Sequence, residues 1–95
     1  MIAESSRAVA AAIRRFPGRA ASIRRLAERS EAFRDMCEEL AAAEAALARI
    51  EASPPANRAE RMAECEGWIV RLTAEMSAAL RQPEVIPLPV ARKPP

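Results

Sequence analysis

The feature that most constrains this chain is a pair of apolar heptad runs on either side of a proline turn. Spacings of three and four residues place the apolar side chains of each run along one face of a helix. The turn between them contains Pro54 and Pro55. This pattern predicts an antiparallel, coiled-coil-like two-helix hairpin over residues 30–82. The runs are Phe33, Met36, Leu40, Ala43, Leu47 and Ile50, then Met62, Cys65, Ile69, Leu72, Met76 and Ala79.

Composition places the chain in the all-α class. Among its 95 residues are 23 Ala and only 2 Gly, and aromatic residues make up 3%. Alanine is the strongest helix former, whereas so few large aromatic groups can build only a thin core. A lone hairpin of this size is marginally stable. We therefore expect its apolar seam to be covered by the N-terminal helices, by a second copy, or by a larger partner.

One or two short helices are expected before the hairpin, in a basic segment of residues 1–29. Residues 4–16 are predicted to be helical, with Val9, Ile13 and Phe16 as apolar contacts. Pro17 and Gly18 interrupt this helix, and a second one, with Ile23 and Leu26, is expected to fade near Arg29. The sequence leaves open whether residues 17–52 form one bent helix or two.

The ends of the hairpin helices carry recognisable signals. Ser30 is suited to cap the first helix through its hydroxyl, and Asn57 is suited to cap the second. Pro54 disfavours helix in the residues before it, so the first helix is predicted to end at Ala52. Residues 83–95 contain five prolines and are predicted to form an extended, polyproline-like tail. The second helix should therefore end near Gln82.

Charge is unevenly distributed between the segments. Residues 1–29 carry seven Arg and two Glu, a net charge of +5, whereas residues 30–82 carry six Arg and ten acidic residues, a net charge of −4. The basic cluster could contact phosphates of nucleic acid or of an anionic membrane surface. No aromatic interleaving accompanies it, which favours a solvated face or a patch that pairs with an acidic protein surface. The candidate phosphate contacts are Arg14, Arg15, Arg19, Arg24, Arg25 and Arg29.

The two cysteines are predicted to be reduced. If the turn centres near residue 55, Cys37 faces Thr73 and Cys65 faces Ala45. A helix rises ~1.5 Å per residue, which puts the two sulfurs roughly 12 Å apart, beyond disulfide reach. Reduced thiols favour a cytoplasmic location. The Arg-rich start resembles an organellar transit peptide, but codon bias explains the same composition, and no uncharged run is long enough to span a membrane.

The residue inventory argues against an enzyme. The chain has no His, no Tyr and no Gly-rich phosphate loop, so the usual general base, metal ligand and phosphate cradle are missing. Acidic pairs such as Glu38 and Glu39 are typical of solvated helix surface. Neither cysteine has a histidine to activate it. We expect no catalytic residues, no metal, no cofactor and no small-molecule substrate.

Two apolar features have alternative interpretations. The small residues 41–46 should let the two helices approach closely, and Trp68 either fills the gap beside them or stands exposed as an interface anchor. The segment Pro87–Arg92 is similar to proline-rich docking peptides. It is equally consistent with a disordered chain end.

The pattern resembles the YdcH-like family of small bacterial proteins. The resemblance covers roughly residues 16–82 and depends on Phe16-Pro17, Ile23, Leu26, Phe33, Met36, Leu40, Leu47 and Arg49-Ile50-Glu51. It implies a short coiled-coil hairpin in a bacterial cytoplasm and carries over no catalytic residues. This chain departs from the family at Ser30-Glu31, where Asn-Pro is usual, and in its N-terminal helix and proline tail.

Together these observations predict a non-catalytic module for protein–protein interaction. It either self-associates or acts as a small accessory subunit of a larger complex. The alternative is an Arg-rich binder of nucleic acid or anionic lipid that dimerises through the hairpin. The interface candidates are Phe33, Met36, Leu40, Leu47, Ile50, Met62, Trp68, Ile69, Leu72 and Met76.

Overall fold

The structure, a computed structural model, describes residues 2–82, with side chains from Ser6 onward. It contains α1 (Ile2–Arg15), a 3₁₀ turn η1 (Pro17–Arg19), α2 (Ala20–Arg29), α3 (Glu31–Glu51) and α4 (Arg58–Arg81). The predicted all-α class is confirmed, since these elements account for the regular structure of the described range. The predictions for the tail, residues 83–95, lie outside it.

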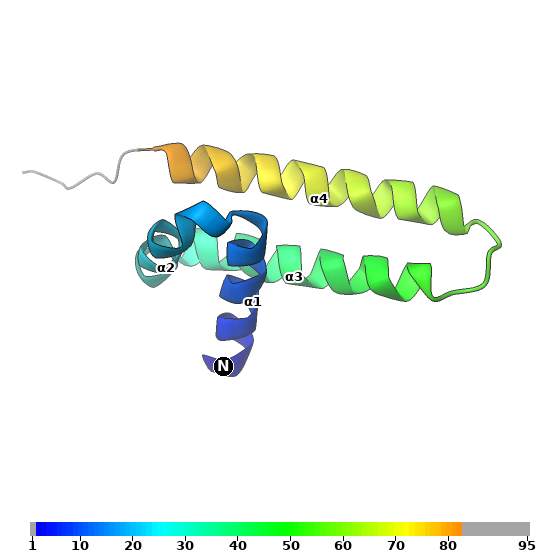
Figure 1. The fold of residues 1–95 in the computed structure, drawn as a ribbon, viewed down its shortest axis with the longest axis horizontal. Coiled ribbons are helices and arrows are strands. Elements are labelled where there is room, and N and C mark those ends of the chain that lie inside the picture. Colours follow the sequence, from blue (N-terminus) through cyan, green and yellow to red (C-terminus); the bar gives the residue numbers. More distant parts are fainter. Residues whose placement is uncertain (1, 83–95) are drawn as a thin grey trace, which may run out of the picture.

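Helices α3 and α4 form the long body of the molecule. They lie side by side and run in opposite directions, joined by the turn at residues 52–57 (Figure 1). We refer to α3, this turn and α4 as the hairpin. The thiol of Cys65 donates a hydrogen bond to the Ala43 carbonyl at 3.3 Å, which fixes the local register. The sequence placed Cys65 opposite Ala45, two residues away, because it centred the turn slightly later than the structure does.

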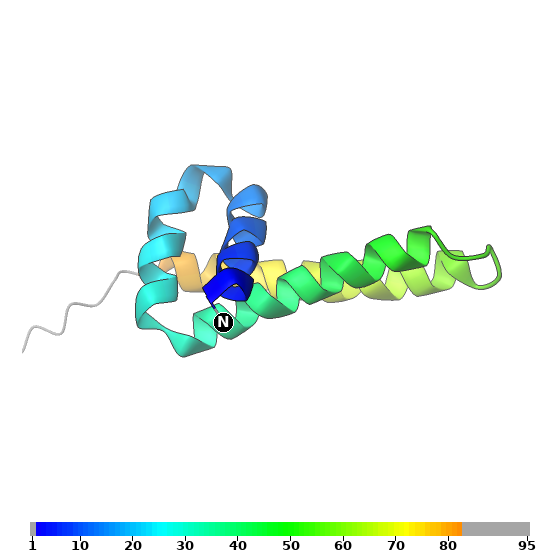
Figure 2. The ribbon, with the colours of Figure 1, turned by 90° about the horizontal axis from the view of Figure 1, so that it is seen from below.

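Helices α1 and α2 cover only one part of the hairpin. Both pack on α3, and α2 also touches α4. In Figure 2, α1 and α2 stand beside the part of the hairpin that contains the C-terminal end of α4, while the half that carries the turn projects beyond them. The N-terminal segment therefore shares a core with the hairpin.

Ser30 separates α2 from α3, so residues 17–52 contain two α-helices with a sharp joint. Its backbone is extended, with φ −125° and ψ 112°, and its hydroxyl accepts a hydrogen bond from the Phe33 N–H at 3.0 Å. This is the predicted N-cap, which satisfies a donor that the first helical turn leaves free. Asn57 precedes α4 as predicted, but it is left-handed (φ 59°) and makes no side-chain capping bond.

Arginine side chains stabilise the C-terminal ends of these elements. The last carbonyls of a helix have no partner within it, and guanidinium groups donate to them here. Arg34 Nη1 donates to the Ala27 carbonyl of α2 at 2.6 Å, and Arg19 Nη2 donates to the Leu80 carbonyl of α4 at 2.6 Å. Cationic groups at these positions also complement the negative end of the helix dipole.

The core is built largely from small side chains in α1 and larger ones in the hairpin. On α1 the buried residues are alanines, whereas Val9, Ile13 and Phe16, the predicted contacts, are only half-buried against the core. Alanines let two helices approach closely, so they occupy the centre of the contact and the larger side chains its margin. The buried residues are Ala8, Ala11, Ala12, Ile23, Ala27, Phe33, Cys37, Leu40, Ala43, Cys65, Ile69, Leu72, Met76 and Leu80.

Candidate functional site

The half of the hairpin next to the turn is an uncovered two-helix surface. Between Ala43 and Cys65, a stretch that the structure describes in full, no side chain is fully buried. Its apolar seam is half-buried because two helices alone leave the sides of their contact open to solvent. We call residues 44–66 the uncovered half; Cys65, at its border with the covered part, is buried. Its half-buried apolar residues are Ala46, Leu47, Ile50 and Met62.

The uncovered half also carries exposed alanines. Ala45 and Ala48 lie on α3, and Ala59 and Ala63 lie on α4. Small side chains leave the helix backbones accessible to close approach by another helix, as they do where α1 meets α3. The uncovered half therefore exposes small side chains in addition to its charged residues.

The structure divides the ten interface candidates into two equal groups. Five are buried in the chain's own core: Phe33, Leu40, Ile69, Leu72 and Met76. The other five are half-buried and reach the surface: Met36, Leu47, Ile50, Met62 and Trp68. Only the second group is accessible to another molecule without unfolding.

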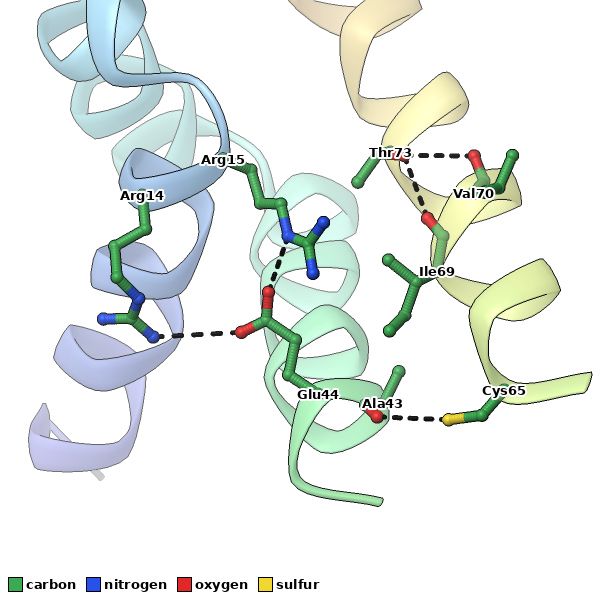
Figure 3. Close-up of polar contacts among 8 residues, drawn as sticks. All are labelled: Arg14, Arg15, Ala43, Glu44, Cys65, Ile69, Val70 and Thr73. Carbon is green, nitrogen blue, oxygen red and sulfur yellow. Dashed lines mark hydrogen bonds and ion pairs between the residues drawn. The ribbon is translucent and has the colours of Figure 1, made fainter. Parts of the chain in front are cut away.

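Trp68 lies at the border of the two halves. It is half-buried and packs against the core, and part of its side chain stays exposed to solvent. Val70, two residues further along α4, is 64% exposed. The hydroxyl of Thr73 donates back to the Ile69 and Val70 carbonyls at 2.9 and 3.1 Å, so this polar group is satisfied within α4 (Figure 3).

A groove between α1 and α3 adjoins the uncovered half. Its floor is made of alanines, and arginines stand at its α1 side. Arg15 Nε donates to Glu44 Oε2 at 2.7 Å, and Arg14 Nη2 lies 3.8 Å from Glu44 Oε1 (Figure 3). The groove has a volume of about 450 Å³ and is lined by Arg7, Ala10, Ala11, Arg14, Ala41, Glu44 and Ala45. We call it the α1–α3 groove.

The six candidate phosphate contacts do not form one surface. Arg14 and Arg15 pair with Glu44, and Arg19 donates to the Leu80 carbonyl. The other three, Arg24, Arg25 and Arg29, lie exposed on α2. Arg14, Arg15 and Arg19 thus make contacts within the chain, and the pairing with Glu44 lowers the positive charge offered to a phosphate backbone.

The cysteines are free and buried. Burial, with a smaller contribution from the Glu38 carboxylate, raises the pKa of Cys37 from 9.0 to about 11. A thiol is nucleophilic as its thiolate, so Cys37 is unreactive at neutral pH. Among the described residues there is also no cluster of His, Cys, Asp and Glu able to hold a metal ion.

The sequence analysis did not identify two structural features that matter for this surface. One is the alanine face of α1. Ala8, Ala11 and Ala12 occupy positions i, i+3 and i+4, which lie on a single helix face. The other is the capping role of Arg19, for which a linear sequence gives no signal because its acceptor lies 61 residues away. The first could have been found by treating alanine as a packing residue.

No described helix is long and apolar enough to cross a lipid bilayer. Comparison with protein-family models, with curated proteins and with solved structures finds no match to this chain.

Proposed function

We propose that this chain is a non-catalytic helical module that binds another protein chain through the uncovered half of its hairpin. It does so either as a homo-oligomer or as a small accessory subunit of a larger complex. The observation that carries the proposal is the position of the half-buried Ile50 and Met62, which continue the apolar seam beyond Leu47, the residue that packs at the edge of the core. Burial of such side chains drives association at about 25 cal/mol per Å² of apolar surface.

The proposal includes the coiled-coil-like character of the hairpin and its membership of the YdcH-like family. Support comes from the heptad spacing of the two helices and from the Phe16-Pro17 start, where Phe16 precedes the turn η1 and Pro17 is its first residue. The proposal also places the chain in the bacterial cytoplasm. The free thiols of Cys37 and Cys65 support this location, because disulfides are rare there.

Binding of nucleic acid or anionic lipid is the less supported function. Such binding requires several arginines directed together toward phosphates. Three of the six candidates already contact Glu44 or the Leu80 carbonyl. Glu44 would also repel a phosphate from the face where Arg14 and Arg15 lie.

The test is site-specific photo-crosslinking in cells. A benzophenone amino acid replaces Ile50, in the uncovered half, and separately Glu38, which is exposed on the covered part of α3. We expect protein adducts, with this chain or with another, from position 50 and few from position 38. Equal labelling from both positions, adducts with RNA alone, or no adducts from position 50 would overturn the proposal.

A further inference from the structure

We propose that the α1–α3 groove binds the first turns of α4 of a second copy, in a reciprocal two-fold dimer. This inference rests on the proposed function, since it names the partner of the same surface. The groove borders the uncovered half, because Glu44 and Ala45 belong to both. Occupation of the groove by a second hairpin therefore brings the two uncovered halves together.

The groove has a specific chemistry. Ala10, Ala11, Ala41 and Ala45 give it a floor without bulky side chains, and Arg7 and Arg14 lie two helical turns apart along α1. The Glu44 carboxylate is matched by Arg15 at 2.7 Å. Arg14 also lies 3.8 Å from Glu44, so this one carboxylate faces two arginines, and together with Arg7 they leave the groove with a net positive charge. An occupant should be a helix with small residues on one stripe and acidic residues beside it.

The start of α4 has the complementary arrangement. Ala59 and Ala63 are exposed four residues apart, and Glu60 and Glu64 repeat the same spacing beside them. Residues four apart lie on one face of a helix. The uncovered half as a whole carries five Glu and three Arg, a net charge of −2, against +5 for residues 1–29. Opposite charges of this kind fix the register of an interface and speed its formation.

Two other occupants fit less well. The tail, residues 83–95, contains one Glu against Arg92 and Lys93, a net charge of +1, and is repelled by the arginines. A nucleic-acid backbone would meet the Glu44 carboxylate and an alanine floor that offers no hydrogen bonds. A two-fold dimer has the further property that each groove–helix contact occurs twice. Weak surface ion pairs then add up.

The first experiment measures the dimer dissociation constant of the full chain by sedimentation equilibrium, with charge-reversed variants. We expect Arg7→Glu with Arg14→Glu, and separately Glu60→Arg with Glu64→Arg, to weaken the dimer at least about tenfold, which is 1.4 kcal/mol. The four changes together should restore the affinity to within about threefold of the original, because the charges are exchanged across the interface. Circular dichroism checks that each variant is folded.

Arg24→Glu with Arg71→Glu is the matched control. Both residues are exposed, outside the groove and outside the uncovered half, and the change in net charge is the same. The control should leave the dissociation constant within about twofold, since charges separated by more than the Debye length are screened. If the control weakens the dimer as much as the groove variant, or if the fourfold variant does not recover, the assignment of the groove is overturned.

A second arm separates this inference from the proposed function. A chain ending at Gln82 should dimerise like the full chain. Loss of the dimer in this shortened chain would show that residues 83–95 make the dimer contact, and would overturn the inference. If the wild-type chain is a monomer but still crosslinks to a different protein from position 50, a second copy is excluded as the partner and the proposed function stands. A monomer without such adducts would overturn both.

Discussion

The two halves of the hairpin have the same kind of sequence and different surroundings. Apolar residues recur at three and four positions in both, yet Phe33 and Leu40 are 1% and 0% exposed, whereas Leu47 and Ile50 are half-buried. The difference is α1 and α2, which pack on the first half of α3 and leave the second half without a cover. Heptad spacing therefore defines which face of a helix is apolar, and neighbouring elements decide how much of that face is buried.

The strongest way to test this comparison is to truncate one large residue in each half. Phe33→Ala, in the covered half, should lower the free energy of unfolding by about 3–5 kcal/mol, because it leaves a cavity in a closed core. Ile50→Ala should lower it by about 1 kcal/mol or less, since that side chain is already partly hydrated. Urea unfolding with circular dichroism gives both values.

Protein concentration sharpens the same measurement. If the uncovered half is buried in a dimer, the loss of unfolding free energy caused by Ile50→Ala should grow with protein concentration. Part of the loss caused by Phe33→Ala should be independent of protein concentration, because Phe33 is buried within the single chain. A concentration-independent loss at Ile50 as large as that at Phe33 would contradict the difference between the halves.

Alkaline pH should weaken the covered half through Cys37. Below pH 9.0 the thiol is protonated in both states. Between pH 9.0 and about 11 the unfolded chain loses this proton and the folded chain keeps it, so the folded state is progressively destabilised. A shift of two units corresponds to about 2–3 kcal/mol once pH 11 is reached.

The matched control for this pH effect is Cys37→Ala. The substitution should lower stability at all pH values and remove the part of the alkaline decline that belongs to Cys37. Urea unfolding on both sides of pH 9.0 measures how steeply the free energy of unfolding falls with pH. An unchanged slope in the variant would show that Cys37 does not cause the decline.

The smallest expected effect compares the starts of the two hairpin helices. Ser30→Ala removes the hydroxyl that accepts from Phe33 N–H and should cost about 1 kcal/mol. Asn57 makes no such bond and is left-handed, so Asn57→Gly should be neutral or slightly stabilising. Thermal unfolding of the two single variants gives the comparison. Equal losses at both positions would mean that Asn57 has a capping role that its hydrogen bonds do not show.

Local signals in the sequence predicted the elements well. The proline turn, the capping serine and the spacing of apolar residues depend on contacts within a few positions, and they placed the ends of α3 and α4 within one residue. Asn57 was the right position for a helix start, although its backbone is left-handed and its side chain makes no capping bond. The all-α class followed from the same local information together with the alanine content.

The arrangement of the elements was not predictable in the same way. The packing of α1 on α3 depends on Ala8, Ala11 and Ala12, and alanine is common on exposed and buried helix faces alike. Likewise, an arginine in a basic cluster has the same local sequence whether it meets phosphate or a carbonyl 61 residues away. The sequence indicated the hairpin seam, but the border between its covered and uncovered parts follows from tertiary contacts.

The bond between Arg19 and the Leu80 carbonyl has a consequence for synthesis on the ribosome. The chain emerges N-terminus first, and α1, α2 and α3 can begin to pack before α4 is complete. Leu80 is the second-last residue of α4, so this bond can form only when almost all of the described chain has been made. Until then the Arg19 guanidinium and the apolar face of α3 that awaits α4 remain hydrated. A nascent chain that stops short of Leu80 should therefore be the form most readily cleaved by proteases.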